Sequence, residues 1–244
     1  MTLEFRTAMQ AAFPGSIPAA DYLDTVRSSL GAVGFDPETT LPLVSICRDE
    51  LTTNFFARVQ EQWGPAFTLA GLGGVPALGA TGWGAAFAHI PYTSGRGSLL
   101  VFGLPHIGIE DDGTVGMTVR EGQDSPTSTC GALTAIYDMS QRGTIPNEVD
   151  LDDFEATKLA LRLVVDGHKP DSLVDLTVAA LDATEVDLWA AIDAQEIWKD
   201  HNVAVCCGVQ IHGHGGKDWV WPRSISLTDA TGERRQIDAF TPTA

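Results

Sequence analysis

Apolar runs bounded by turn residues predict the strands of this chain. Leu41–Ile46, Ser98–Leu104 and Val203–Ile211 are almost continuously apolar, which is typical of strands buried inside a sheet. Trp219–Leu227 and Arg235–Phe240 flank an Asp-Ala-Thr-Gly turn and predict a hairpin. A second hairpin is expected within residues 107–119, where apolar and polar positions alternate around an Asp-Asp-Gly turn.

Helical periodicity fills the segments between these strands. The segments with this pattern are 21–30, 53–63 and 151–198, the last broken into two or three helices at Gly167 and Pro170. Strands and helices mixed along the whole sequence indicate an α/β fold with one central mixed sheet flanked by helices. No shift in composition divides the chain, so we interpret residues 1–244 as a single domain, with residues 1–40 as a helical N-terminal extension.

Three residues that could bind a metal lie at the ends of predicted elements. Cys47 and His106 each come shortly after a predicted strand, and Cys130 is expected in the first turn of a helix capped by Ser128 or Thr129. Sites in open α/β sheets assemble at the carboxyl ends of the strands. Two thiolates and an imidazole suit zinc, with a fourth position left for water. The residues alone leave open a second interpretation, in which both cysteines are structural and the histidine is an ordinary loop residue.

The charge of the chain excludes some classes of partner. There are 15 basic and 32 acidic residues, a formal net charge of −17, so neither nucleic acid nor an anionic membrane surface is an expected partner. No apolar run is long enough to span a membrane, and the first residues do not resemble a secretory signal. Four irregularly spaced cysteines are too few for a disulfide framework. We therefore expect a cytoplasmic protein with free thiols.

Three short blocks around the candidate ligands resemble one family. Ser-Ile-Cys47-Arg-Asp-Glu, Gly-Leu-Pro-His106-Ile-Gly and Thr-Cys130-Gly-Ala are similar, in sequence and order, to the low-CO2-inducible protein B/C family, the theta-class carbonic anhydrases. The resemblance covers about residues 40–140. It implies a zinc site like that of beta carbonic anhydrases, formed by these two cysteines and this histidine. It also implies reversible hydration of carbon dioxide to bicarbonate, and a homodimer.

The resemblance also implies roles for two residues beside the first cysteine. Asp49 is expected to accept a hydrogen bond from hydroxide formed at the zinc and so orient its attack on carbon dioxide. Arg48 is expected to hold the Asp49 carboxylate by a bidentate pair. The glycine-rich segment 66–90, with Trp83 and Phe87, is expected to line an apolar pocket or an interface.

Two other functions are compatible with the same residues. One is a zinc-stabilised, catalytically weak scaffold that binds bicarbonate or a partner. The other is a Cys-His hydrolase with Cys47 as nucleophile and His106 as base, which leaves Cys130 without a role. Outside these blocks, His212 and His214 are interpreted as parts of a solvated loop, and the adjacent cysteines of the third strand as core residues.

Overall fold

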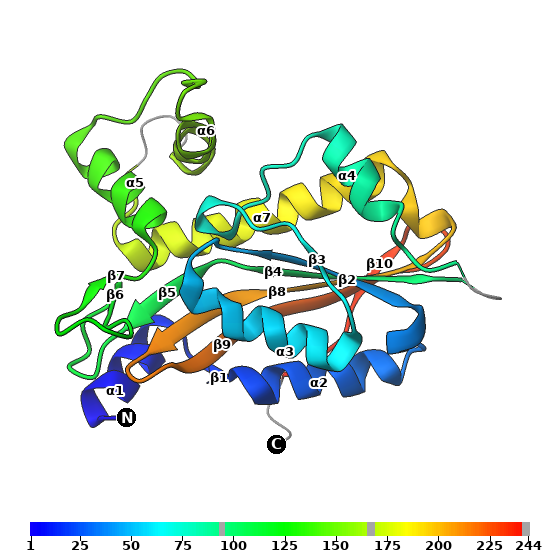
Figure 1. Ribbon diagram of the computed structural model, residues 1–244, viewed down its shortest axis with the longest axis horizontal. Coiled ribbons are helices and arrows are strands. Elements are labelled where there is room, and N and C mark those ends of the chain that lie inside the picture. Colours follow the sequence, from blue (N-terminus) through cyan, green and yellow to red (C-terminus); the bar gives the residue numbers. More distant parts are fainter. Residues whose placement is uncertain (93–95, 165–168, 241–244) are drawn as a thin grey trace.

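The computed structural model describes residues 1–92, 96–164 and 169–240, and a large mixed sheet forms its centre (Figure 1). The strands of this sheet are β1 (Ile17–Pro18), β2 (Thr40–Ile46), β3 (Phe67–Thr68), β4 (Ser98–Leu104), β5 (His106–Ile109), β8 (Asn202–Gly213), β9 (Lys217–Thr228) and β10 (Arg234–Gln236). Their order is β1-β9-β8-β4-β2-β3, with β5 beside β8 and β10 beside β9. Strands β3, β2, β4, β5 and β8 run parallel to their neighbours, whereas β9 is antiparallel to β8, which confirms the predicted mixed sheet.

Helices cover both faces of the sheet (Figure 1). They are α1 (Leu3–Ala12), α2 (Ala19–Gly31), α3 (Thr53–Trp63), α4 (Ala80–Phe87), α5 (Gly131–Arg142), α6 (Phe154–Leu163) and α7 (Leu173–Ala194). The apolar sides of α2 and α3 pack on one face, and α7 packs along the other, so the sheet separates two hydrophobic cores. Helices α5 and α6 pack against α7 around a third, smaller core that contains Cys47 and Cys130.

Most of the predicted elements are confirmed. Strands β2, β4 and β8 are buried along almost their whole length, which explains why their sequences are continuous apolar runs. The predicted helices correspond to α2, α3, α6 and α7, and Gly167 lies outside the described residues. Residues 1–40 contain α1 and α2. They also contribute β1, which pairs with β9, and Phe5 and Phe13, which are buried in the core.

The prediction of a hairpin within residues 107–119 is wrong. The Asp-Asp-Gly turn does form, with the N–H of Gly113 donating to the carbonyl of Glu110 at 2.9 Å, but only one bridge, between Ile109 and Val115, follows it. Strand β5 instead pairs in parallel with β8, and the later residues form β6 (Met117–Thr118), which pairs with β7 (Thr127–Ser128). Alternation along a segment identifies strands but not their partners, and the 12-residue β8 is long enough to pair with both β4 and β5.

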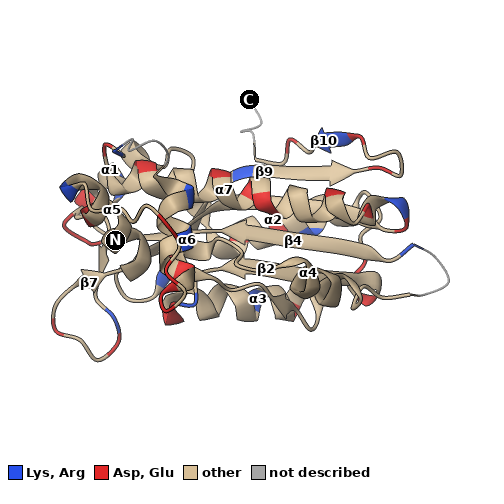
Figure 2. Cartoon of the chain, turned by 90° about the horizontal axis from the view of Figure 1, so that it is seen from above, with Lys and Arg blue, Asp and Glu red and all other residues tan. Residues whose placement is uncertain are grey.

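Charged residues lie on the helices and loops around an uncharged sheet centre. Figure 2 shows β2 and β4 without Lys, Arg, Asp or Glu, and acidic residues on the outer helices. In the described part of the chain, no helix has both the length and the apolar character that a membrane-spanning helix needs.

Candidate metal centre

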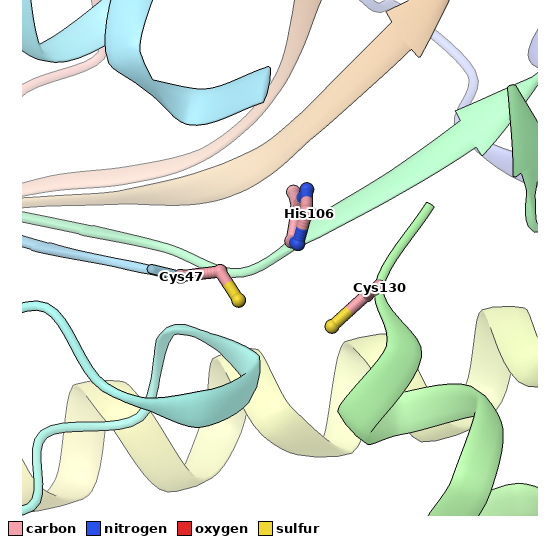
Figure 3. Close-up of side chains that lie close together, drawn as sticks. All are labelled: Cys47, His106 and Cys130. Carbon is pink, nitrogen blue, oxygen red and sulfur yellow. The ribbon is translucent and has the colours of Figure 1, made fainter. Parts of the chain in front are cut away.

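Cys47, His106 and Cys130 lie together at one end of the sheet. One potential ligand atom from each residue lies within 4.8 Å of the other two, and all three residues are buried. Figure 3 shows both thiols directed toward the space beneath the histidine ring. Among the described residues, these three form the only such cluster of His, Cys, Asp and Glu. We call them the three candidate ligands.

Strand pairing explains why two of the candidate ligands meet. Strands β2 and β4 are parallel, with Ile46 opposite Leu104, so the residues that follow both strands leave the sheet at the same edge. Pro105 then interrupts the strand, and β5 restarts at His106 against β8. The glycine-rich loop packs directly against Pro105 at this point. A side chain at Gly74 would not fit, because its Cβ would lie only 2.8 Å from the Cα of Pro105.

The third candidate ligand is held by a contact with β5. Cys130 is the N-cap of α5 rather than a residue of its first turn, so the predicted cap at Ser128 or Thr129 is wrong by one or two positions. Ser128 belongs to β7 instead. Gly108 on β5 allows the adjacent chain to approach, because a Cβ there would overlap Thr129 Oγ1 and the carbonyl oxygen of Met117.

The two thiols are electrostatically coupled. The hydrogen bond from Cys130 lowers the pKa of Cys47 well below its ordinary value, and the same contact raises the pKa of Cys130. Cys47 is therefore the more readily deprotonated of the two thiols. A divalent cation would favour the deprotonated form of both, because thiolates rather than thiols are metal ligands.

His106 presents one free nitrogen to this space. Its Nδ1 lies 3.1 Å from Nε2 of His212, whereas its own Nε2 is buried and has no hydrogen-bond partner among the described residues. His212 Nδ1 in turn lies 2.7 Å from Asp218 Oδ1. Burial lowers the pKa of His212, against the opposing effect of Asp218. The sequence interpretation of His212 as a solvated loop residue is wrong, since its ring is buried in the sheet.

The predicted pair between Arg48 and Asp49 does not form. Asp49 Oδ2 instead accepts a hydrogen bond from Arg120 Nη2 at 2.8 Å, and both side chains are largely buried. Arg120 also donates to the carbonyl oxygens of Ser128 and Thr129, each at 2.9 Å. One guanidinium therefore connects the segment after the first candidate ligand with the segment before the third.

Arg48 faces away from Asp49 and pairs with Glu155 on α6. The other carboxylate oxygen of Glu155 accepts a hydrogen bond from the N–H of Leu72 at 2.6 Å. The neighbouring Gly71 forms a bridge with Cys47. Arg48 and Glu155 thus fix the glycine-rich loop where it passes the first candidate ligand.

The glycine-rich segment 66–90 lines a cavity, in agreement with one of its two predicted roles. The cavity has a volume of about 660 Å³ and lies between this segment, α6 and α7; Leu72, Val75 and Trp83 contribute to its mostly apolar wall. Phe87 stacks on Trp83 but is not part of the wall. None of the three candidate ligands lines this cavity. It is therefore separate from the metal centre.

Sequence reasoning missed two residues that lie beside the candidate metal centre in space but far from their partners in the sequence. Arg120 follows Asp49 by 71 positions, and no local pattern distinguishes it from a surface arginine. Asp218 is detectable only once the β8–β9 register is known, because it is paired with His212 in that register. Cys206 and Cys207 are both fully buried in the core, as predicted.

Comparisons with known proteins agree with this geometry. A family model described as limiting CO2-inducible proteins B/C beta carbonic anhydrases matches residues 16–229. The crystal structure of PtLCIB4, a homologue of the limiting CO2-inducible protein LCIB, is 27% identical, with a TM-score of 0.80 over 95% of this chain and 99% of that chain. The crystal structure of LCIB is 26% identical, with a TM-score of 0.76 over 94% and 96%. No functionally curated protein matches the chain.

Proposed function

The chain belongs to the limiting CO2-inducible protein B/C family of beta carbonic anhydrases, and we propose that it is a zinc-dependent enzyme that reversibly hydrates carbon dioxide to bicarbonate. The observation that carries this proposal is the buried Cys47–His106–Cys130 cluster, whose potential ligand atoms lie within 4.8 Å of one another. Three protein ligands leave one coordination position open, which is the arrangement of catalytic rather than structural zinc.

The donors at this site fit zinc. Two sulfur atoms and an imidazole nitrogen are soft to borderline ligands, which zinc prefers over the oxygen-rich sites chosen by magnesium and calcium. The unpartnered Nε2 of His106 supports the fit, because a buried ring nitrogen without a partner is unfavourable unless something binds it. When bound, zinc supplies the Lewis acidity that makes hydroxide available from water near neutral pH.

Asp49 is the side chain that we assign to orientation of the reacting water. Its Oδ1 accepts from the N–H of Leu51 at 3.1 Å and its Oδ2 from Arg120, so the carboxylate is fixed while lone pairs remain available. A carboxylate held in this way can accept a hydrogen bond from water and leave the oxygen lone pair directed at carbon dioxide. In this proposal Arg120 has the anchoring role first expected of Arg48.

Arg48 remains a candidate functional residue because it directly follows a candidate ligand. Its partner Glu155 accepts a hydrogen bond from the N–H of Leu72. We therefore propose that Arg48 acts by fixing the loop beside Cys47. We also propose a homodimer, as in the sequence prediction. The apolar cavity wall formed by segment 66–90 supports an association surface on this side of the molecule.

One purified sample tests the proposal. We expect stoichiometric zinc by elemental analysis and carbon dioxide hydration in a stopped-flow assay with a pH indicator. A Cys-His hydrolase would contain no stoichiometric zinc. A scaffold would retain zinc but would not accelerate hydration above the rate in buffer, and that result would refute the enzyme.

A further inference from the structure

A buried carboxylate–imidazole pair, Asp218 and His212, lies on the Nδ1 side of the candidate ligand His106. His212 on β8 and Asp218 on β9 are partners in the antiparallel register, and their side chains are only 3% and 13% exposed. His106 is paired with Gln210, two positions before His212 on β8, so His106 and His212 project from the same face of the sheet. The two imidazole rings meet edge to face, with centroids 5.1 Å apart.

The hydrogen atoms in this chain of contacts can be placed in only one way if a metal binds His106 Nε2. That nitrogen must then offer a lone pair, so the proton of the neutral ring is on Nδ1 and is donated to His212 Nε2. His212 must consequently carry its own proton on Nδ1, where Asp218 Oδ1 accepts it at 2.7 Å. Every N–H in this chain of contacts then has an acceptor. The remaining ring nitrogen is Nε2 of His106, the atom that has no hydrogen-bond partner among the described residues.

We propose that His212 and Asp218 are positioning residues that fix the tautomer and ring orientation of His106 for metal binding. Asp218 holds the Nδ1–H tautomer of His212, and His212 then presents an acceptor that only the Nδ1–H tautomer of His106 can satisfy. This inference rests on the metal site of the proposed function but not on its reaction. Hydrogen-bonding groups behind a metal-ligating histidine typically change metal affinity or activity about 10–100-fold when they are removed.

Asp218 lies between the buried histidine pair and a surface cleft. It lines a cleft of about 740 Å³ together with Arg120, His212 and His214, so its carboxylate reaches solvent at the cleft wall. His214 provides a natural contrast. It lies two residues from His212, but its side chain is 51% exposed, and its Nδ1 lies 3.4 Å from Glu110 Oε2 rather than beside a candidate ligand.

Zinc affinity measured by chelator competition tests the proposal without any assay of catalysis. We expect His212→Leu to bind zinc about 10–100-fold more weakly than the parent, because it removes the acceptor behind His106. His212→Gln should recover most of the affinity, since a Gln carbonyl oxygen can accept from His106 Nδ1–H. His214→Leu is the matched control and should leave the affinity unchanged. Equal affinity in parent and His212→Leu would overturn the proposal.

Nuclear magnetic resonance of ¹⁵N-histidine gives a second readout that does not depend on a variant's stability. In the zinc-loaded parent, long-range ¹H–¹⁵N spectra should show His106 and His212 as Nδ1–H tautomers, with the His212 signals assigned from His212→Gln. An Nε2–H tautomer of His212 would overturn the proposal. Absence of zinc from the parent would overturn it together with the proposed function. Normal zinc binding without carbon dioxide hydration would overturn only the proposed reaction.

Discussion

Arg120 Nη2 lies 2.8 Å from Asp49 Oδ2, although the two residues are separated by 71 positions in the sequence. The same arginine binds the carbonyl of Thr129, directly before Cys130. An arginine can do this because its planar guanidinium presents several donors in fixed directions, which a lysine cannot reproduce. The contact connects the candidate metal centre to a loop that contains none of the three candidate ligands.

Asp49→Asn should lose most carbon dioxide hydration and keep its zinc. We expect a decrease of about 10–100-fold, since the amide keeps the shape of the side chain but weakens its role as an acceptor. Stopped-flow hydration and elemental analysis on the same sample provide the measurement. Asp138→Asn, an exposed carboxylate on α5, is the control. Parental activity in Asp49→Asn would contradict the assigned role.

Arg120→Lys should reduce hydration more than Arg48→Lys does. The first change removes the guanidinium that binds Asp49, whereas the second weakens a pair with Glu155 in which Arg48 is 55% exposed. The ratio of kcat/KM for carbon dioxide hydration between the two variants measures this difference. The opposite ranking would favour the originally predicted Arg48–Asp49 pair.

Cys47→Ser and Cys130→Ser should each lose most of the bound metal. A serine hydroxyl is a much poorer zinc ligand than a thiolate, and only two of the three candidate ligands remain. Metal content after dialysis against a weak chelator measures this. Cys206→Ala removes a buried thiol far from any ligand role and should keep its metal. Full metal retention in either serine variant would show that the ligand set is wrong.

Gly108→Ala should destabilise the protein by about 1–3 kcal/mol and weaken metal binding. The new methyl group would overlap Thr129 and the backbone of Met117, so the segment before Cys130 must move. Chemical denaturation and metal content report the two effects. Gly84→Ala in α4 has open space at its Cβ and should be neutral or slightly stabilising.

Tyr22→Phe should make the protein less sensitive to alkali. Burial raises the pKa of Tyr22 well above its ordinary value, and its hydroxyl has no hydrogen-bond partner among the described residues. The unfolded chain releases this proton near pH 10 while the folded chain keeps it, so stability is present below about pH 10 and falls above it. Above that pH, the free energies of unfolding of parent and variant, measured by chemical denaturation, should diverge by about 1.4 kcal/mol per pH unit. Tyr92→Phe, at an exposed position, should behave like the parent.

Light scattering tests the homodimer. We expect a particle of twice the 26.0 kDa chain mass at micromolar concentration. A charged substitution in the apolar cavity wall, Ala77→Glu, should weaken the association if this side forms the interface. A 26.0 kDa particle for the parent would refute the dimer.

The sequence predicts the parts of this fold whose cause is local. The buried strands β2 and β4 are apolar on both faces, and their predicted limits agree with the structure to within one residue. The blocks around Cys47, His106 and Cys130 identify the candidate ligands through their resemblance to one family, because the residue types alone leave a structural role open. The convergence of Cys47 and His106 follows from where parallel strands end, which the strand pattern already indicates. Cys130 joins them through the close contact of its segment with Gly108 on β5, which the strand pattern does not indicate.

The missed features depend on pairing between distant segments. Nothing near Ile109 indicates that β5 pairs with β8 rather than with the residues after the turn. Arg48 is adjacent to Asp49 in sequence, but successive side chains diverge where an extended strand ends, so adjacency misidentified the partner. His212 looked like part of a polar glycine-rich loop, but the extra length of β8 carries it into the sheet.

The pairing of β5 with β8 also bears on when the candidate metal site is completed during synthesis. During synthesis, Cys47, His106 and Cys130 all leave the ribosome before residues 202–213, yet β5, which carries His106, is paired with that later strand. The nascent chain therefore exposes loose thiols and an unanchored imidazole until most of its length has been translated. The candidate site is therefore completed late in biogenesis, and under the proposed function the species that receives zinc is an almost complete apoprotein.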